Sequence, residues 1–435
     1  MLESKILYCS FCGRSQHEVE KLMAGTAVRI CNTCVELCSN IMNKELKKNQ
    51  FDEKKISTPL EIYKQLCEHV IGQDDTKRIL SVAAYNHYKR LRHSNSSMNQ
   101  NDSNSCMISK SNIMMIGSTG CGKTLLAQTL AKILKVPFAM ADATTLTEAG
   151  YVGEDVENVI VSLLQAANYK IKDAEMGVIC IDEFDKIAAK ESGRSITRDV
   201  SGQGVQQALL KLIEGTIASV PPAGGRKHPQ QEFLKVDTSN ILFICSGSFD
   251  GLEQIINNRM QKSDLGFGAD ISNKKKLSSG EIFKNVDSED LIKYGIIPEL
   301  IGRLPVITSI DDLSTKDLVR VLIEPKNALI KQYQALFAME GVDLDITDSA
   351  LHAIASIALK RKIGARGLRS IMENLLMKLM FEIPDMQEIC AIKIDEDVVN
   401  GKKEAELIKG ARFIYGDDQK HKLAEQIKLE HHQQH

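Results

Sequence analysis

The residues best suited to chemistry form one contiguous phosphate-binding pattern. The run Gly117-Ser118-Thr119-Gly120-Cys121-Gly122-Lys123-Thr124 fits G-x-x-x-x-G-K-[ST] at every position. Its glycines allow successive backbone N–H groups to curl around the β-phosphate of a nucleotide. Lys123 is expected to neutralise charge on the β- and γ-phosphates, and the Thr124 hydroxyl to reach Mg²⁺. A glycine turn without a ligand is the alternative, and the full match argues against it.

Two adjacent acids provide a second set of reactive groups. Asp182 and Glu183 directly follow the apolar run Val178–Ile181, which is typical of a buried parallel strand. Ligands of α/β proteins bind at the carboxyl ends of such strands. We expect Asp182 to orient Mg²⁺ through water and Glu183 to polarise an attacking water molecule. An apolar run followed by acids alone is weak support for a hydrolytic site, but it becomes strong support when a phosphate loop precedes it in the chain.

Four cysteines near the N-terminus have the spacing of a zinc site. Cys9-x-x-Cys12 and Cys31-x-x-Cys34 can place four thiolates tetrahedrally around Zn²⁺, with each pair on a tight turn. A module of about 50 residues has too little core to fold without the metal. Unpaired thiols are the alternative, and Cys38 lies outside the pattern.

A short glycine-flanked segment lies between the phosphate loop and the two acids. Tyr151 and Val152 stand between Gly150 and Gly153. Apolar residues then recur with helical spacing from position 156, so a helix is predicted there with Glu154 and Asp155 in its first turn. The residues alone leave two alternatives open: the Tyr-Val pair grips a ligand in a channel, or the tyrosine is buried in a turn.

The composition limits which classes of protein this chain can belong to. Of its 435 residues, 55 are Lys or Arg and 57 are Asp or Glu, so the net charge is −2. This near-neutral balance excludes a broad electrostatic trap for nucleic acid but not a local basic groove. The hydrophobic share of 43% indicates a globular chain, and no apolar run is long enough to span a membrane. The N-terminus lacks a signal-peptide core, and eleven cysteines indicate thiols and metal, so a cytoplasmic protein is expected.

The elements that must position these groups follow from apolar periodicity. A strand over 113–116 should run into the phosphate loop, and a helix over 125–134 should follow it. Earlier helices are predicted from Pro59 towards Val70 and over 79–91, before a Ser/Asn-rich loop at 94–105. Residues 110–310 alternate strands and helices, as in a parallel α/β domain. The chain beyond 311 is mainly helical, with strand-like runs such as 390–394.

Taken in order, these motifs resemble the ClpX family, the AAA+ unfoldase subunits of the ATP-dependent Clp protease. The resemblance rests on the cysteine pairs, the phosphate loop, 150–155 and 181–187, and it extends from Cys9 to about Pro384. It implies an α/β AAA+ P-loop NTPase with a parallel sheet, a mainly helical C-terminal small domain and an N-terminal four-cysteine zinc-binding module. The implied domains are a zinc-binding domain (1–50), a linker (51–59), a large α/β domain (60–310), a small domain (311–410) and a polar tail (411–435).

The resemblance also implies roles for individual residues. Those expected to catalyse ATP hydrolysis are Lys123, Asp182, Glu183 and Arg303, the last acting on a neighbouring subunit's γ-phosphate. Those expected to contact the nucleotide are Val70, Ile71, Gly117, Ser118, Thr119, Gly120, Cys121, Gly122, Lys123, Thr124, Leu125, Asp182 and Arg366. Those expected to grip substrate polypeptide are Tyr151, Val152, Arg198, Arg226, Lys227 and His228. The tripeptide expected to dock into the partner peptidase ClpP is Leu265, Gly266 and Phe267.

The implied activity is ATP-dependent protein unfolding by a homohexamer. ATP, Mg²⁺ and Zn²⁺ would be the cofactors, with tagged or unfolded proteins and adaptors as partners, and with no nucleic acid and no membrane. No protease constellation is evident, so cleavage would belong to ClpP. One alternative is a nucleic-acid-directed AAA+ ATPase such as a clamp or helicase loader. Another is a zinc-containing interaction protein with a vestigial ATP site.

Three positions depart from the pattern usual in the family. Ser118 stands where proline is common, position 121 is a cysteine, and the docking tripeptide begins with Leu265 instead of isoleucine. The backbone N–H groups of the loop are retained, so phosphate binding should persist. Cys121 beside the phosphates predicts an ATPase that thiol reagents inhibit.

Overall fold

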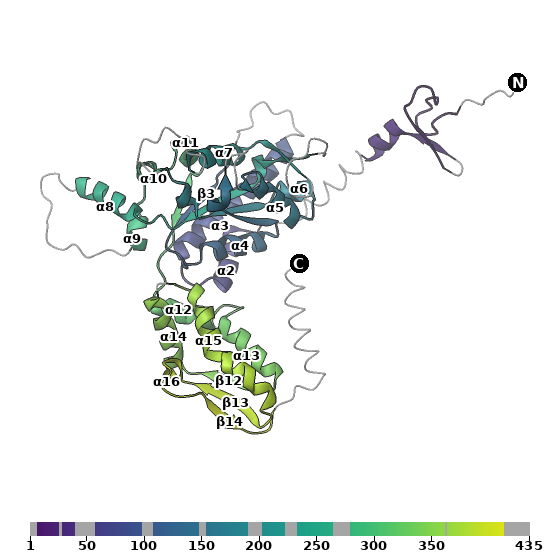
Figure 1. Ribbon diagram of the computed structural model, residues 1–435. Helices are drawn as coiled ribbons and strands as arrows, with labels where there is room; N and C mark the ends of the chain where they lie inside the picture. The colour runs from purple at the N-terminus through teal and green to yellow at the C-terminus, as the bar shows by residue number, and fades with distance from the viewer. Residues whose placement is uncertain are drawn as a thin grey trace. The chain divides into compact units, whose positions relative to one another are not determined.

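The computed structural model describes residues 7–25, 28–39, 57–97, 108–147, 154–189, 202–221, 233–263, 279–361 and 363–412. The chain divides into two compact units, Met1–Ile56 and Ser57–His435 (Figure 1). Within the described ranges, no helix combines the length and the apolar character that crossing a membrane requires.

The first unit is a small cysteine-centred module. Strand β1 (Leu22–Ala24) pairs antiparallel with β2 (Arg29–Cys31), and a helix follows over 32–39. Within residues 7–25 and 28–39, its core consists of three buried cysteines against which Val19, Leu22 and Ile30 pack. So small an apolar core cannot by itself offset the conformational entropy of folding.

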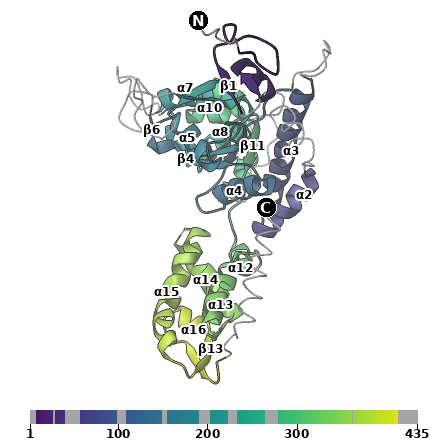
Figure 2. The same cartoon turned by 90° about the vertical axis from the view of Figure 1, so that its right-hand side faces the viewer.

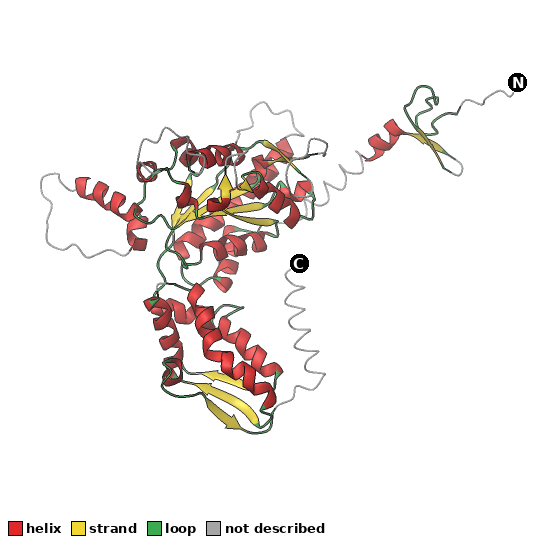
Figure 3. Cartoon of the chain, viewed as in Figure 1, coloured by secondary structure: helices red, strands yellow, loops and turns green. Residues whose placement is uncertain are grey.

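The second unit is built on a five-stranded parallel sheet, seen as arrows in Figure 3. The strand order is β11-β3-β10-β7-β4, and every neighbouring pair is parallel. The strands are β3 (Ile113–Ile116), β4 (Phe138–Asp142), β7 (Val178–Asp182), β10 (Leu242–Gly247) and β11 (Val306–Ser309). The predicted strands over 113–116 and 178–181 are therefore confirmed, and both lie in the middle of this sheet.

Alternate residues of the central strands point to opposite faces of the sheet, and each face has its own core. Ile113 and Met115 pack with one layer, formed by α2 (Pro59–His69), α3 (Asp74–Ser97) and α4 (Lys123–Leu134), which lie together in Figure 2. Met114 and Ile116 pack into the core of the other face. Helices that contribute to that core are α5 (Asn158–Ala166), α7 (Gln203–Glu214), α8 (Leu252–Ser263), α10 (Ser288–Tyr294) and α11 (Pro298–Gly302).

Smaller elements connect these layers. They are η1 (Ala143–Thr145), β5 (Leu146–Thr147), β6 (Glu154–Asp155), α6 (Ile171–Ala174), η2 (Phe184–Ile187), η3 (Thr238–Asn240), α9 (Ser279–Phe283) and the antiparallel hairpin β8 (Ile217–Val220) and β9 (Leu234–Asp237).

The C-terminal part has a separate hydrophobic core and is mainly helical. Its helices are α12 (Thr315–Ile323), α13 (Leu329–Met339), α14 (Asp348–Lys360), α15 (Arg366–Glu382), η4 (Ile383–Asp385) and α16 (Glu396–Val399). Strand β13 (Ile389–Ile394) pairs parallel with β12 (Asp343–Ile346) and antiparallel with β14 (Glu406–Lys409). The strand predicted at 390–394 is confirmed, whereas the domain boundaries 60–310 and 311–410 stay predictions.

Two local predictions were wrong. Glu154 and Asp155 do not begin a helix, because they form β6, which pairs parallel with β5, and α5 starts only at Asn158. The Ser/Asn tract was predicted as a loop from position 94, yet α3 continues to Ser97. A helix that is already nucleated extends at little cost, even through residues of modest propensity.

Candidate nucleotide-hydrolysis site

The phosphate loop joins β3 to α4, as the motif requires. Gly122 is the N-cap of α4 with φ 101°, and Gly120 has φ 82°, values that L-residues with side chains rarely adopt. The loop therefore presents backbone N–H groups and the positive end of the α4 dipole in one direction. α4 begins at Lys123, two residues before the predicted start, so this lysine belongs to the helix's first turn.

The Lys123 ammonium lies inside the loop. Its side chain is buried, and Nζ donates to the carbonyl oxygens of Gly117 at 2.6 Å and Ser118 at 2.9 Å. Among the described residues, the partners of this buried charge are carbonyls and none is an acid. A phosphate oxygen is a stronger acceptor than a carbonyl, so this ammonium is placed to exchange one for the other.

Thr124 and Asp182 meet at the end of the sheet. The Thr124 hydroxyl donates to Asp182 Oδ2 at 2.9 Å, and the Ser246 hydroxyl donates to Oδ1 at 2.7 Å. These groups are hydroxyl and carboxylate oxygens, the donor type that Mg²⁺ prefers, so they fit this ion. Ser246 was missed by sequence reasoning. Its only signal is a polar residue near the carboxyl end of the apolar strand β10.

Glu183 is held in an unusual backbone conformation. Its φ of 54° and ψ of 33° lie in the left-handed region, which costs a non-glycine residue about 1–3 kcal/mol. Buried Phe184 and Asp185 fix the following turn, because the Asp185 carboxylate accepts from the Ser248 N–H at 3.0 Å and from its hydroxyl at 3.2 Å. The strand thus ends abruptly and leaves the Glu183 side chain exposed, where it can reach water.

Segments distant in sequence converge on the phosphate loop. The Ala365 N–H donates to the Gly120 carbonyl at 3.1 Å, and the Ser118 hydroxyl donates to Asp312. A Cβ at Gly120 would lie 2.5 Å from the Ile363 carbonyl oxygen, so only glycine fits there. Arg366, the exposed first residue of α15, directly follows this contact.

The predicted adenine segment is tied to the same region. Val70 and Ile71 are buried, and the side chain of nearby Gln73 makes two hydrogen bonds to the Asp311 backbone, at 2.7 and 2.8 Å. Asp311 adjoins Asp312, the partner of Ser118. The structure therefore brings 70–73, the phosphate loop, 311–312 and 363–366 together. Leu125, also predicted to contact nucleotide, is half-exposed in the first turn of α4.

Arg303 has different neighbours. It follows α11, its side chain is exposed, and its Nε lies 3.0 Å from Glu214 Oε1 on α7. Within the ranges that the structure describes, the contact found for its guanidinium is this ion pair and not a group of its own phosphate loop.

The Cys121 thiol is shielded, contrary to what its place in the loop suggested. It is 3% exposed, and its Sγ donates to the Ser118 carbonyl at 2.8 Å. Burial raises the pKa of this thiol, although Lys123 lowers it to a smaller extent. A protonated, covered thiol is a poor nucleophile, so the expected sensitivity to thiol reagents is not supported at this residue.

The four predicted zinc ligands are brought together. The sulfur atoms of Cys9, Cys12, Cys31 and Cys34 all lie within 4.8 Å of one another, and those of Cys12 and Cys31 are 3.7 Å apart. Tetrahedral Zn–S bonds of about 2.3 Å require sulfur separations of about 3.8 Å, so the set fits zinc. The second pair is not on a tight turn, because Cys31 ends β2 and Cys34 lies on the helix over 32–39.

Backbone donors favour the thiolate form of Cys9, whereas burial raises the pKa of Cys34 to about 12. Desolvation raises the pKa of Cys9, but hydrogen bonds from the backbone at Cys12, Phe11 and Cys31 bring it down to about 6. The Cys31 N–H lies 3.3 Å from Cys9 Sγ. Thiolate is the form that binds metal.

The remaining site predictions fall outside the described residues. They are Tyr151, Val152, Arg198, Arg226, Lys227, His228, Leu265, Gly266 and Phe267. Described elements flank two of these segments in sequence: α7 follows Arg198, and residues 226–228 lie between strands β8 and β9.

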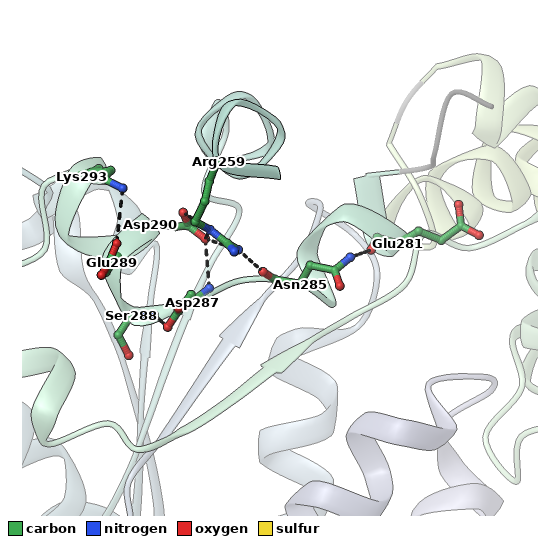
Figure 4. A network of polar contacts seen from close by, with 8 residues as sticks. All are labelled: Arg259, Glu281, Asn285, Asp287, Ser288, Glu289, Asp290 and Lys293. Carbon is green, nitrogen blue, oxygen red and sulfur yellow. Dashed lines mark hydrogen bonds and ion pairs between the residues drawn. The ribbon is translucent and has the colours of Figure 1, made fainter. Parts of the chain in front are cut away.

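The helices on either side of 265–267 are held by a polar network (Figure 4). Arg259 on α8 forms a bidentate ion pair with the fully buried Asp290 of α10, with contacts of 2.9 to 3.1 Å. Asp290 also accepts from the Asp287 N–H at 3.0 Å and so closes the capping box of α10. Arg259 donates to the Asn285 carbonyl as well. The network therefore connects α8 to α10 and to the segment that precedes α10.

Comparison with protein families agrees with this geometry. Residues 7–44 match the ClpX C4-type zinc finger, 108–307 match the AAA domain (Cdc48 subfamily), and 313–394 match the C-terminal, D2-small domain of ClpB protein. The matches occur in the order that the motifs predict and include both the cysteine cluster and the phosphate loop. The chain is therefore a ClpX-like AAA+ protein, a nucleotide-binding ATPase of the Clp chaperone type with a zinc-finger module.

Proposed function

We propose that this chain is an ATP-driven protein unfoldase. It acts as a homohexamer, threads tagged or unfolded polypeptides through a central pore and delivers them to the ClpP peptidase in the cytoplasm. The contact of Gly120 with Ala365 carries the proposal, because it joins the phosphate loop to the start of α15. A nucleotide bound at such a joint can change the arrangement of the segments around it as it is hydrolysed.

The chain's own residues divide the chemistry of hydrolysis. Lys123 leaves the carbonyls of Gly117 and Ser118 and neutralises the β- and γ-phosphates. Thr124 and, through water, Asp182 would hold Mg²⁺, and this ion would neutralise charge on the phosphates. Glu183 polarises the attacking water from the end of β7. These roles require an acid that water can reach and a cation inside the phosphate loop, and the exposed side chain of Glu183 and the buried side chain of Lys123 support them.

Two arginines complete the site across subunits. Arg366 reports on nucleotide within its own subunit, since it follows the contact with Gly120. Arg303 reaches the γ-phosphate of the nucleotide in the neighbouring subunit, and its ion pair with Glu214 is replaced by this contact. Arginine suits both roles because it stays charged and binds phosphate through two N–H groups.

Mechanical work falls to exposed loops of the ring. Tyr151 and Val152 grip the polypeptide, with Arg198 and the Arg226-Lys227-His228 loop at the pore. Leu265, Gly266 and Phe267 dock on ClpP, and the zinc module recruits substrates and adaptors. Folded domains are stable by only about 5–15 kcal/mol, so a few ATP-driven pulls can unfold one.

The test is degradation of a tagged fluorescent protein by this chain, ClpP and Mg-ATP. Wild type should abolish the fluorescence. Glu183→Gln should bind ATP without turnover, and Tyr151→Ala should hydrolyse ATP with little unfolding. Tyr151→Phe is the matched control that keeps the aromatic ring and should retain most activity.

Two outcomes would contradict the proposal. A wild-type chain that hydrolyses ATP but unfolds no tagged substrate, even with adaptors, would overturn the assignment of a polypeptide substrate, and DNA-stimulated hydrolysis would then support a loader. A wild-type chain that binds no ATP would indicate a vestigial site.

A further inference from the structure

Gln206 is a fully buried amide in the middle of the hydrolytic domain. Its Nε2 donates to the carbonyls of Ile187 at 2.8 Å and Gly295 at 3.1 Å. Its Oε1 accepts from the Ile297 N–H at 2.8 Å. Both protons of the amide and its oxygen are therefore engaged, and each partner is a backbone group. Because all three partners are backbone groups, the Gln206 amide links separate segments of the chain.

The three partners flank residues of the hydrolysis site. Ile187 is the last residue of η2, the turn that begins directly after Glu183. Gly295 is the C-cap of α10, and Ile297 is the N-cap of α11, the helix that ends just before Arg303. Gln206 thus connects the turn after the catalytic acid with the base of the arginine segment.

The segments that Gln206 links are also in direct contact with each other. The Gly295 carbonyl also accepts from the Ala189 N–H at 2.9 Å. Gly295 has φ 115°, and a Cβ there would collide with the Ala189 carbonyl oxygen. Moving one segment therefore moves the other or breaks buried hydrogen bonds, each of which costs about 1–3 kcal/mol when its partner is left unpaired.

Helix α7 holds the arginine segment at two points. Gln206 lies near the start of α7 and accepts a hydrogen bond from the N-cap of α11. Glu214 is the last residue of α7 and pairs with the Arg303 guanidinium at 3.0 Å. Eight residues of helix separate the two points by about 12 Å. Helix α7 therefore helps to set the position of Arg303 relative to Glu183, together with Asn112, whose side-chain amide donates to the Arg303 carbonyl at 3.0 Å.

We infer that Gln206 is a positioning residue for ATP hydrolysis: it fixes the base of the Arg303 segment against the turn that follows Glu183. The inference rests on the proposed function, because it takes Arg303 as a contact of the neighbouring γ-phosphate. In the assembled ring, Gln206 would therefore connect Glu183, which acts in its own subunit, with Arg303, which acts in the neighbouring subunit. Its loss should slow the chemical step and leave ATP binding largely intact.

The first test compares Gln206→Met with Gln207→Met in the assembled protein. Both residues lie on α7, but Gln207 is exposed, so it is a matched control. Gln206→Met should lower kcat for ATP hydrolysis about tenfold or more, as small misplacements of catalytic groups do. The KM for ATP should stay within about twofold, and the hexamer should persist by light scattering. Gln207→Met should leave both constants unchanged.

A double-mutant cycle with Arg303→Ala separates positioning from a merely structural role. If Gln206 acts through Arg303, the double variant should have the kcat of Arg303→Ala alone. A loss of folded or active protein would instead multiply with the effect of Arg303→Ala, and that result would overturn the inference. An unchanged kcat in assembled Gln206→Met would overturn it too.

The outcomes also distinguish this inference from the proposed function. If Arg303→Ala leaves kcat unchanged, the role of Arg303 is wrong, and coupling through Gln206 is wrong with it. If Arg303→Ala lowers kcat but Gln206→Met does not, only the present inference is wrong. Should Gln206→Met fail to fold, Gln206→Asn takes its place in the cycle. It keeps a neutral amide but is one methylene too short to reach all three backbone partners, so a comparable loss of kcat is expected.

Discussion

At the residue scale, Cys121 shows how burial changes the chemistry that a motif suggests. Its thiol is 3% exposed with a raised pKa, whereas Cys67 is half-buried and its Sγ lies 3.4 Å from the Lys77 ammonium. We expect iodoacetamide to alkylate Cys121 at least about tenfold more slowly than Cys67 in the native protein. Peptide mass spectrometry over a time course measures both rates. A rapid loss of ATPase activity that Cys121→Ser prevents would contradict this.

His87 predicts a defined response to acid. It is 2% exposed, and its Nε2 lies 3.0 Å from the Asn240 carbonyl. Among the described residues, its Nδ1 has no hydrogen-bond partner. Burial first, and then the charges of Arg90 and Lys110, lower the pKa of His87 from 6.5 to about 3. The unfolded chain therefore binds more protons between these values, so stability is fully present above pH 6.5 and is lost as the pH falls towards 3.

The measurement is the midpoint of thermal unfolding at pH 7 and at pH 5. At pH 5, His87 should cost up to about 2 kcal/mol of stability relative to pH 7. His87→Gln should reduce the difference between the two midpoints. His93→Gln, an exposed change on the same helix, should not. Equal acid responses in all three proteins would show that His87 does not titrate in this way.

The residues of the site differ in how far the sequence alone could identify them. The phosphate loop, Asp182 and Glu183 belong to contiguous patterns whose spacing reflects their chemistry. Ser246, Asp312 and Gln206 follow no local pattern, because each acquires its role from a partner far away in the chain. The buried state of Cys121 likewise depends on packing that a motif does not specify.

At the element scale, the pair Arg259–Asp290 determines how α8 is attached. Arg259→Met would leave a fully buried carboxylate with the Asp287 N–H but without its cation. The loss should cost about 3 kcal/mol, the low end for a buried pair, because the arginine is partly exposed. Thermal unfolding of the variant should occur several degrees lower. ATPase activity below the transition should change little.

A matched set of variants isolates the pair. Lys293→Met breaks the exposed ion pair with Glu289, which is 3.6 Å long, and should cost less than about 1 kcal/mol. Adding Asp290→Asn to Arg259→Met removes the unpaired charge and keeps an oxygen for the capping box, so it should restore most of the loss. If the double variant is no more stable than Arg259→Met, the buried charge is not the cause.

Helices and strands were predictable where the spacing of apolar residues matched a single type of secondary structure. Buried strands β3 and β7 and helices α2 and α4 follow from apolar runs and caps. β6 was missed because two acids before a helix are an ordinary first turn, and only pairing with β5 makes them a strand. Local propensity is overruled when tertiary contacts supply the hydrogen bonds.

At the scale of the whole molecule, metal should control one unit and not the other. In its described part, the first unit has a core of three buried cysteines and few apolar side chains, while 57–435 contains large cores of its own. Zinc binding of about 10–16 kcal/mol would therefore supply the folding free energy of the first unit alone. A chelator should release one zinc per chain, measured with a chromogenic indicator, and make the first unit sensitive to protease. Basal ATPase activity should stay within about twofold.

Cysteine variants separate this prediction from a general effect of chelation, which also removes Mg²⁺ unless it is added back in excess. Cys12→Ser should abolish zinc binding and expose the first unit to protease in the absence of any chelator, because it removes one of four clustered ligands. Cys38→Ser, outside the cluster, should keep the metal. If Cys12→Ser also abolished basal hydrolysis in a folded AAA+ domain, the two units would depend on each other energetically. The zinc module would then help to stabilise the hydrolytic domain, whereas the separate cores predict that each unit folds on its own.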